Sequence, residues 1–273
     1  MFDQPQQVTM QRARGRAAVA LSARAGRTAL DRLHQSGSAK AMLPRCHGPV
    51  PEVVFLNTAG GITGGDRLEY ALDLGAGARA VATTQTAERV YASSGGAGAI
   101  DVAMKVGTGA RLHWMPQETI LFDRAALDRR TTISLEGDAS CLVAETLVLG
   151  RAAMGEIVRT LDATDRRRVT RDGIPVLAEP IRLTSDVLAR DDAAGLSGAK
   201  ALATVALVAP GAEDAMASVR RLLEVEGVDA AASAWDGKCV VRMMAREAWP
   251  LRRLVARVLV QLGQGPLPRV WQT

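Results

Sequence analysis

Three stretches of the sequence share one plan: LDLGAGARAVATTQTAERVY (72–91), MKVGTGARLHWMPQETILFD (104–123) and SLEGDASCLVAETLVLGR (134–151). Each contains an alternating apolar strand, a turn of small residues, a second strand and then polar residues. The turns recur after about 30 residues, a spacing that is typical of stacked structural repeats. The sequence therefore predicts a mainly β protein with stacked layers, either a layered β-sandwich or a short solenoid-like β body.

Period-two alternation extends the predicted β-rich body from residue 12 to residue 184. Apolar side chains fall on one face in the runs Leu68 to Leu74, Ile100 to Val106 and Thr131 to Leu135. Short alternating runs that glycine interrupts are typical of half-buried strands. Asp172-Gly173 lies between two such runs and predicts a hairpin turn. Residues 1–11 are expected to form a flexible tail.

The C-terminal third has a different pattern, which predicts a strand-helix-strand-helix segment over residues 200–263. The continuous apolar run ALATVALVA at 201–209 is typical of a fully buried strand. Residues 212–226 are predicted to be helical, and residues 238–245 alternate as a strand. The second predicted helix has one apolar stripe made of Leu251, Leu254, Val255, Val258, Leu259 and Leu262. Together with the β-rich body, this segment is expected to form a single domain over 12–273, with an exposed loop at 186–198.

Composition limits the class of protein. The chain has 273 residues, of which 48% are hydrophobic, and this is enough for a packed core. Three distant cysteines argue against a disulfide framework and fit a reducing compartment. The N-terminus does not resemble a signal peptide, and no apolar run reaches the roughly 18 residues that cross a bilayer. We therefore expect a soluble cytoplasmic protein with no membrane partner.

The net charge of +5 is mildly basic, and much of the excess is arginine in short clusters such as residues 166–168. Such clusters indicate either a solvated face or a patch for an acidic protein or a nucleic acid. A nucleic-acid module would need a contiguous basic stripe, preferably with exposed aromatic side chains. Aromatic residues make up only 3% of this chain, so no nucleic-acid partner is expected.

The segment LNTAGGITGGD (56–66) is the most distinctive motif, with four glycines in six positions. It lacks the Lys-Ser/Thr of a phosphate-binding loop and the helix that follows a dinucleotide-binding loop. A structural double turn that presents Asp66 is favoured over nucleotide binding. We expect the Asp66 carboxylate to be solvated, so Asp66→Ala should cost under about 0.5 kcal/mol.

Carboxylates around the apolar runs allow a second class of function. Glu118 and Asp123 flank one run, and Glu145 and Glu156 frame another. Two carboxylates that face each other across an open cleft would indicate a glycosidase, whereas exposed acids would not. Thr84 lies in TTQTAERVY (83–91), which would either line a wet cavity or form a strand edge and a turn.

The sequence predicts no tight metal site. His34, His47 and His113 are the only histidines, and Cys46-His47 is the one adjacent pair of soft ligands. Neighbouring residues on a strand point to opposite faces, whereas a tight nickel or zinc site needs three or four nitrogen or sulfur ligands. Cys46 and His47 therefore remain weak candidates. No Ser-His-Asp or Cys-His arrangement makes a credible catalytic group, which favours a binding protein over an enzyme.

Six stretches, in this order, resemble the urease accessory protein family UreD, also called UreH. They are RTALDRLHQSGSAK (27–40), LNTAGGITGGDRL (56–68), TTQTAERVY (83–91), WMPQETILFD (114–123), ETLVLGRAAMGE (145–156) and PRVWQT (268–273). The resemblance covers nearly the whole chain. Ser38-Ala39 stands just before Lys40, where the family commonly has proline, so the local turn is expected to differ.

The resemblance implies a non-catalytic, β-rich chaperone with a few helices that binds urease apoprotein and the accessory protein UreF. UreF recruits the GTPase UreG, which carries nickel, and the complex promotes lysine carbamylation and insertion of two nickel ions. No cofactor is expected to stay bound, and Ni²⁺ would only be in transit. The family's proposed internal passage for the ion implies these candidates by motif position: Asp66, Thr84, Glu118, Asp123, Glu145 and Glu156. The alternative function is a carbohydrate-active hydrolase on a β-solenoid.

Overall fold

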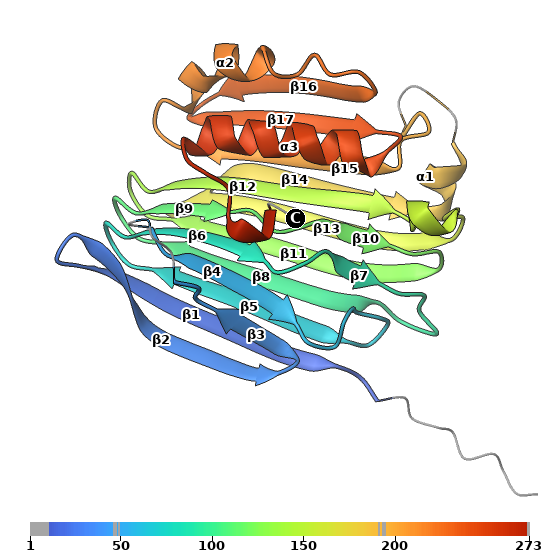
Figure 1. The fold of residues 1–273 in the computed structure, drawn as a ribbon, viewed down its shortest axis with the longest axis horizontal. Helices are drawn as coiled ribbons and strands as arrows, with labels where there is room; N and C mark the ends of the chain where they lie inside the picture. Colours follow the sequence, from blue (N-terminus) through green and yellow to red (C-terminus); the bar gives the residue numbers. More distant parts are fainter. Residues whose placement is uncertain (1–10, 46–47, 49, 191, 193–194, 272–273) are drawn as a thin grey trace, which may run out of the picture.

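The computed structural model describes residues 11–45, 48, 50–190, 192 and 195–271, which form two β-sheets packed face to face (Figure 1). Within these residues, sheet A has seven strands in the order β14-β13-β11-β8-β5-β1-β2, and sheet B follows the order β16-β17-β15-β12-β9-β6-β4-β3. The short strands β7 and β10 also belong to sheet B, where β10 pairs with both β12 and β7.

The strands of sheet A are β1 (Arg14–Arg24), β2 (Arg27–Gly37), β5 (Arg67–Leu74), β8 (Gly98–Val106), β11 (Ala125–Leu135), β13 (Leu161–Arg171) and β14 (Ile174–Thr184). Those of sheet B are β3 (Ala39–Met42), β4 (Glu52–Asn57), β6 (Arg79–Thr84), β7 (Glu88–Val90), β9 (Arg111–Trp114), β10 (Thr119–Leu121), β12 (Ser140–Leu149), β15 (Ala201–Val208), β16 (Val228–Trp235) and β17 (Lys238–Ala245). The helices are α1 (Ser185–Ala189), α2 (Met216–Arg220) and α3 (Ala248–Gly263), with 3-10 turns η1 (Ala152–Met154), η2 (Ala212–Ala215) and η3 (Arg269–Trp271).

The predicted repeat is confirmed as a solenoid-like stack. In sheet A, β5, β8 and β11 are parallel neighbours, and Tyr70, Val102 and Thr131 occupy equivalent positions on them. In sheet B, β6, β9 and β12 are parallel neighbours in the same way. Each repeat therefore contributes one strand to each sheet before the chain returns, and parallel pairing follows from this coiled path.

The main core lies between the sheets. The predicted apolar faces point inward, and the side chains of Leu68, Leu72, Ile100 and Met104 are buried there. The opposite face of sheet B packs against α3, where all six residues of the predicted apolar stripe are buried. The predicted hairpin at Asp172-Gly173 is also confirmed, since it joins β13 to β14 and both residues have positive φ angles of 49° and 83°.

The C-terminal third differs from the sequence-based expectation in three places. The helix predicted over 212–226 is shorter, because η2 and the α-helical turns of α2 end at Arg220 and a turn precedes Gly227. The strand β16 was not predicted; its alternation is hidden because most of its residues are alanine or serine. The predicted loop at 186–198 overlaps α1, whose first turn is capped by the Thr184 hydroxyl as it accepts a hydrogen bond from the Val187 N–H. The tail at residues 1–10 lies outside the described residues.

Among the helices that the structure describes, none combines the length and the hydropathy needed to cross a membrane.

Candidate functional site

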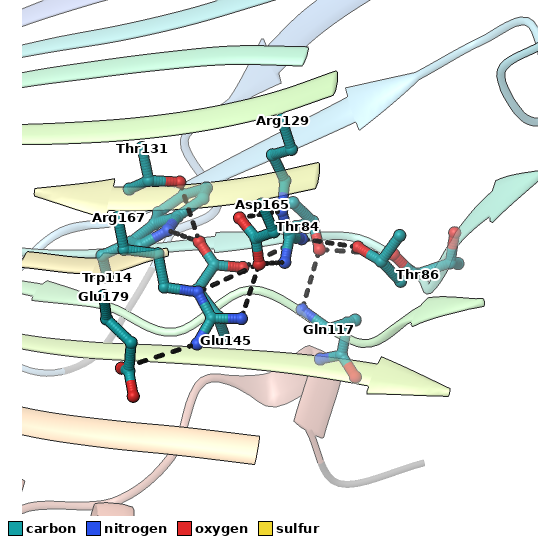
Figure 2. Close-up of polar contacts among 11 residues, drawn as sticks. Thr84, Thr86, Trp114, Gln117, Arg129, Thr131, Glu145, Asp165, Arg167 and Glu179 are labelled. Atoms are coloured by element: carbon teal, nitrogen blue, oxygen red, sulfur yellow. Dashed lines mark hydrogen bonds and ion pairs between the residues drawn. The ribbon is translucent and has the colours of Figure 1, made fainter. Parts of the chain in front are cut away.

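Charged side chains cross the core between the sheets at positions where alternation places inward-facing residues (Figure 2). We call this group the interior network, and it consists of Arg129 on β11, Glu145 on β12, Asp165 and Arg167 on β13, and Glu179 on β14. Each of these residues is between 2% and 8% exposed. Buried charges are costly unless they are paired and hydrogen-bonded, so their partners decide what the network can do.

Arg129 is the centre of the network and links the two sheets. Its Nε and Nη2 atoms donate to the two carboxylate oxygens of Asp165 at 3.0 and 2.6 Å. This bidentate pair forms because Arg129 and Asp165 are in register on neighbouring parallel strands of sheet A. The Nη1 atom reaches sheet B, where it lies 3.0 Å from Glu145 Oε2 and donates to Thr119 Oγ1 at 2.6 Å.

Glu145 is held by groups from both sheets. Its Oε1 atom accepts hydrogen bonds from Trp114 Nε1 at 3.0 Å and from Thr131 Oγ1 at 3.1 Å. Its Oε2 atom faces Arg129. This carboxylate is therefore satisfied on both oxygens, and it fixes the position of the two sheets relative to each other.

At the Arg167–Glu179 end of the network, the polar atoms are not all hydrogen-bonded. Arg167 binds Asp165 Oδ2 through Nε and Nη2 at 3.0 and 2.5 Å, but its Nη1 atom lies 3.9 Å from Glu179 Oε2. Among the described residues, neither Arg167 Nη1 nor Glu179 Oε2 has a hydrogen-bond partner. A cavity of about 10 Å³ lies beside these atoms and is also lined by Thr204. This is room for one water molecule, which would satisfy both atoms.

Glu179 connects the buried network to an exposed side chain. Its Oε1 atom accepts a hydrogen bond from Arg242 Nε at 2.7 Å, and the Arg242 side chain on β17 is 54% exposed. The pair joins the edge strand β14 of sheet A to sheet B. Polar groups thus continue from the middle of the core to solvent at this edge.

Ion pairs within the network offset the cost of burying Asp165 and Arg129. Burial by itself raises the pKa of Asp165, but the Arg129 and Arg167 guanidiniums outweigh it and hold this pKa below its usual value. Burial likewise disfavours the charged form of Arg129, but Asp165 and Glu145 more than compensate and raise its pKa. Asp165 and Arg129 therefore stay ionised at neutral pH.

Glu88 on β7 is in register with Thr119, the β10 residue that Arg129 Nη1 contacts. Burial raises the pKa of Glu88 to about 7, although a hydrogen bond from Asn57 Nδ2 at 3.2 Å and the charge of Arg129 oppose this shift. Glu88 lines a cavity of about 80 Å³ together with Asn57, Tyr70 and Thr84. We call this cavity, the interior network and Arg242 the polar row, because the charge of Arg129 acts on Glu88 and Arg242 donates a hydrogen bond to Glu179.

Comparison with known proteins identifies the family. The model of the UreD urease accessory protein family matches residues 13–272. The chain belongs to the UreD family. It is 57% identical to the urease accessory protein UreD of Cereibacter sphaeroides over 269 residues, which cover 98% of each chain. It is 53% identical to the protein of the same name from Jannaschia sp., over 97% of each chain. It is 47% identical to that of Paracoccus denitrificans, over 100% of this chain and 96% of the relative.

The six side chains that the UreD resemblance implies for an ion passage occupy different parts of the structure. Glu145 lies in the interior network, and Thr84 lines the cavity beside Glu88. Asp123 and Glu156 are neighbours near the surface, where the Asp123 N–H donates to Glu156 Oε1 at 3.1 Å. Glu118 pairs with Arg252 of α3.

Asp123 and Glu156 have partners that explain their positions. The Asp123 carboxylate accepts the N–H groups of Arg159 and Thr160 at 2.8 and 2.9 Å, which lowers the pKa of Asp123. Glu156 Oε2 accepts from Arg151 Nε at 2.8 Å. These contacts hold the segment that joins β12 to β13.

Four members of the interior network were not predicted from the sequence: Arg129, Asp165, Arg167 and Glu179. The signal for Arg129 was present, because it precedes Thr131 by two residues and so continues the inward face that Thr131, Ile133 and Leu135 predicted. In the sequence, Arg167 stands out only as part of the basic cluster at 166–168. In the structure its side chain points inward, whereas Arg166 and Arg168 are exposed.

The predicted metal candidates Cys46 and His47 lie outside the described residues. Cys141 and Cys239 are free and buried. In the part of the chain that the structure describes, no group of three or more His, Cys, Asp and Glu side chains is arranged to hold a metal ion.

Asp66 is not solvated, and this expectation was wrong. Its carboxylate is 6% exposed and accepts the backbone N–H groups of Ala13 at 2.7 Å and Thr63 at 2.9 Å. The flanking glycines allow close contacts, because a Cβ on Gly64 would collide with the carbonyl oxygen of Gly95. The LNTAGGITGGD segment is therefore a tight structural turn that ties the start of β1 to β5.

We expect Asp66→Ala to lower the free energy of unfolding by about 1–3 kcal/mol, because two shielded N–H groups lose their acceptor. Urea unfolding of the variant and the wild type measures this difference. Asp66→Asn is the matched control, since it keeps one acceptor oxygen and should cost less. A loss under about 0.5 kcal/mol for Asp66→Ala would mean that water replaces the carboxylate.

Two of the segments that carry the UreD resemblance meet in a C-terminal clasp, which we define as Met115, Gln117 and Glu118 with Arg252 and Trp271. Trp271 Nε1 donates to the Met115 carbonyl at 2.9 Å. Arg252 donates to Gln117 Oε1 at 2.8 Å and lies over the Trp271 ring, 4.7 Å from its centroid. The clasp holds the C-terminal segment against sheet B.

Proposed function

We propose that this UreD-family chain acts in the cytoplasm as a non-catalytic scaffold for urease maturation. It binds apo-urease and UreF, and UreF brings the GTPase UreG with its nickel. The complex then assists lysine carbamylation and nickel insertion. The observation that carries this proposal is the family match over residues 13–272, together with relatives that are named urease accessory proteins.

The route of the ion is the second part of the proposal. We place it along the polar row, from the Glu88 cavity past Glu145 to Glu179. Carboxylate and hydroxyl oxygens hold Ni²⁺ less tightly than nitrogen or sulfur ligands do, so they can release it, and neighbouring arginines weaken the binding further. The cavity beside Arg167 and Glu179 has room for one water molecule, so a hydrated ion requires this contact of 3.9 Å to open.

A hydrolase finds little support in the geometry. The carboxylates of the interior network are those of Glu145, Asp165 and Glu179, and all three are buried and face arginines. A glycosidase needs two carboxylates with access to a sugar in an open cleft. The purified chain is therefore expected to hydrolyse neither glycosides nor GTP.

Co-expression of the urease subunits with UreF, UreG and this chain tests the function. Without the chain, urease should contain little nickel and show little activity. With Glu145→Gln or Glu179→Gln, the complex should form but nickel content should fall, because a carboxylate on the route is lost. Glu136→Gln, an exposed acid in the turn after β11, is the matched control and should behave like the wild type.

Two results would contradict the proposal at different levels. Full urease activation without this chain, with no related protein present, would refute the accessory function. Normal nickel loading by both Glu145→Gln and Glu179→Gln, with pull-downs confirming intact complexes, would refute the interior route alone. Thermal melts of both variants separate a loss of nickel transfer from a loss of folding.

A further inference from the structure

A groove of about 610 Å³ lies on the outer face of sheet B, on the side opposite the interior network. Strands β6 and β9 form its floor, and the end of α3 with the segment that follows it forms one wall. We call it the arginine groove, because Arg45, Arg79, Arg111 and Arg269 line it. The lining residues thus come from four separate parts of the chain.

Arg79 and Arg111 are directly opposite each other on neighbouring parallel strands. Like charges in this position destabilise a sheet unless an anion lies between them. Within the residues that the structure describes, none of the four groove arginines forms an ion pair, and Glu52 is the one acid that lines the groove. The groove therefore keeps an unneutralised positive charge.

The rest of the lining is apolar. Val81, Met115, Leu259 and Leu267 lie between the arginines, and Pro266 and Pro268 contribute to the wall. Burial and the nearby charge of Arg111 lower the pKa of His113 to about 4, so this lining imidazole is neutral at physiological pH. A bare inorganic anion would leave the apolar surface uncovered, whereas a peptide with both acidic and apolar side chains would cover all of it.

We infer that the arginine groove docks an acidic segment of a partner protein, with carboxylates on the arginines and apolar side chains on the floor. This inference rests on the proposed function, in which the chain works inside a protein complex. The groove lies on the opposite face of sheet B from the interior network, so docking there leaves the polar row free.

A peptide of alternating Glu and Leu, labelled with fluorescein, tests the groove directly. Fluorescence anisotropy with the full-length wild type should give binding that weakens as salt rises. Arg79→Glu/Arg111→Glu should weaken binding at least about tenfold, a loss of about 1.4 kcal/mol. Arg27→Glu/Arg130→Glu is the matched control, because both arginines are exposed, form no ion pair in the described structure and carry the same change in charge. It should bind like the wild type.

Pull-downs of apo-urease and UreF with the same variants separate the two proposals. Loss of one partner with Arg79→Glu/Arg111→Glu, but not with the control, supports the groove as a docking site. Equal binding of peptide and partners by both variants overturns it. Failure of the wild type to bind either partner refutes the proposed function. In that case, the peptide experiment still tests whether the groove binds an acidic segment. If inorganic phosphate stabilises the wild type and the peptide does not bind, the groove is a small-anion site and the docking inference is wrong.

Discussion

Replacing Arg129 with methionine is expected to lower the free energy of unfolding by about 3–5 kcal/mol. The substitution leaves the Asp165 and Glu145 carboxylates in the core without the guanidinium that contacts both of them. Methionine fills much of the same volume, so the loss comes mainly from unpaired buried charge. Urea unfolding followed by circular dichroism measures it.

Arg130→Met is the matched control, because Arg130 follows on the same strand and its side chain is exposed. It should change stability by less than about 0.5 kcal/mol. The double variant Arg129→Met/Asp165→Leu should cost less than the sum of its single changes, since it removes both members of one ion pair. Equal costs for Arg129→Met and Arg130→Met would show that water or another cation replaces the guanidinium.

The pH dependence of the free energy of unfolding provides a second test of the Arg129–Asp165 pair. The pKa of Asp165 lies below its usual 3.8 in the folded protein, at about 2. The stability that this ionised carboxylate contributes is therefore complete above about pH 4 and is lost as the pH falls toward 2. In Arg129→Met, the free energy of unfolding should therefore depend less on pH between about pH 4 and pH 2. In Arg130→Met, this dependence should match that of the wild type.

Trp271→Ala is expected to have an effect of similar size, about 3–5 kcal/mol. Trp271 is 8% exposed, packs in the core between sheet B and α3 and donates a hydrogen bond to the Met115 carbonyl. Its loss should also release Arg252 from the ring and loosen one wall of the arginine groove. Urea unfolding measures the stability, and hydrogen exchange at residues 264–270 reports the loosening.

Trp249→Ala is the matched control, because Trp249 lies near the start of α3 and is 63% exposed. It should cost far less than Trp271→Ala. Trp271→Phe keeps a ring but not the N–H group, so its cost should lie between these two variants. If Trp271→Ala unfolds at the same urea concentration as Trp249→Ala, the clasp does not stabilise the fold.

The repeating architecture can be predicted from local sequence patterns alone. The stacked sheets follow from the recurring strand-turn-strand plan, because one apolar face every second residue specifies which side of each strand is buried. The apolar stripe of α3 follows from helical periodicity in the same way, and the hairpin at Asp172-Gly173 from the left-handed conformations that these residues tolerate. All of these signals are local, and they need no knowledge of which strands become neighbours.

The polar partners, in contrast, depend on how distant strands pack together. Arg129 and Asp165 are 36 residues apart, Arg242 and Glu179 are 63 apart, and Arg252 and Gln117 are 135 apart. Periodicity places Arg129 on an inward face, but it does not say that Asp165 stands beside it or that Glu145 faces it from the other sheet. The same holds for Arg79 and Arg111, whose opposition depends on strand register. Such pairs form only when distant strands align, so their chemistry is a property of the packed sheets and not of any one segment.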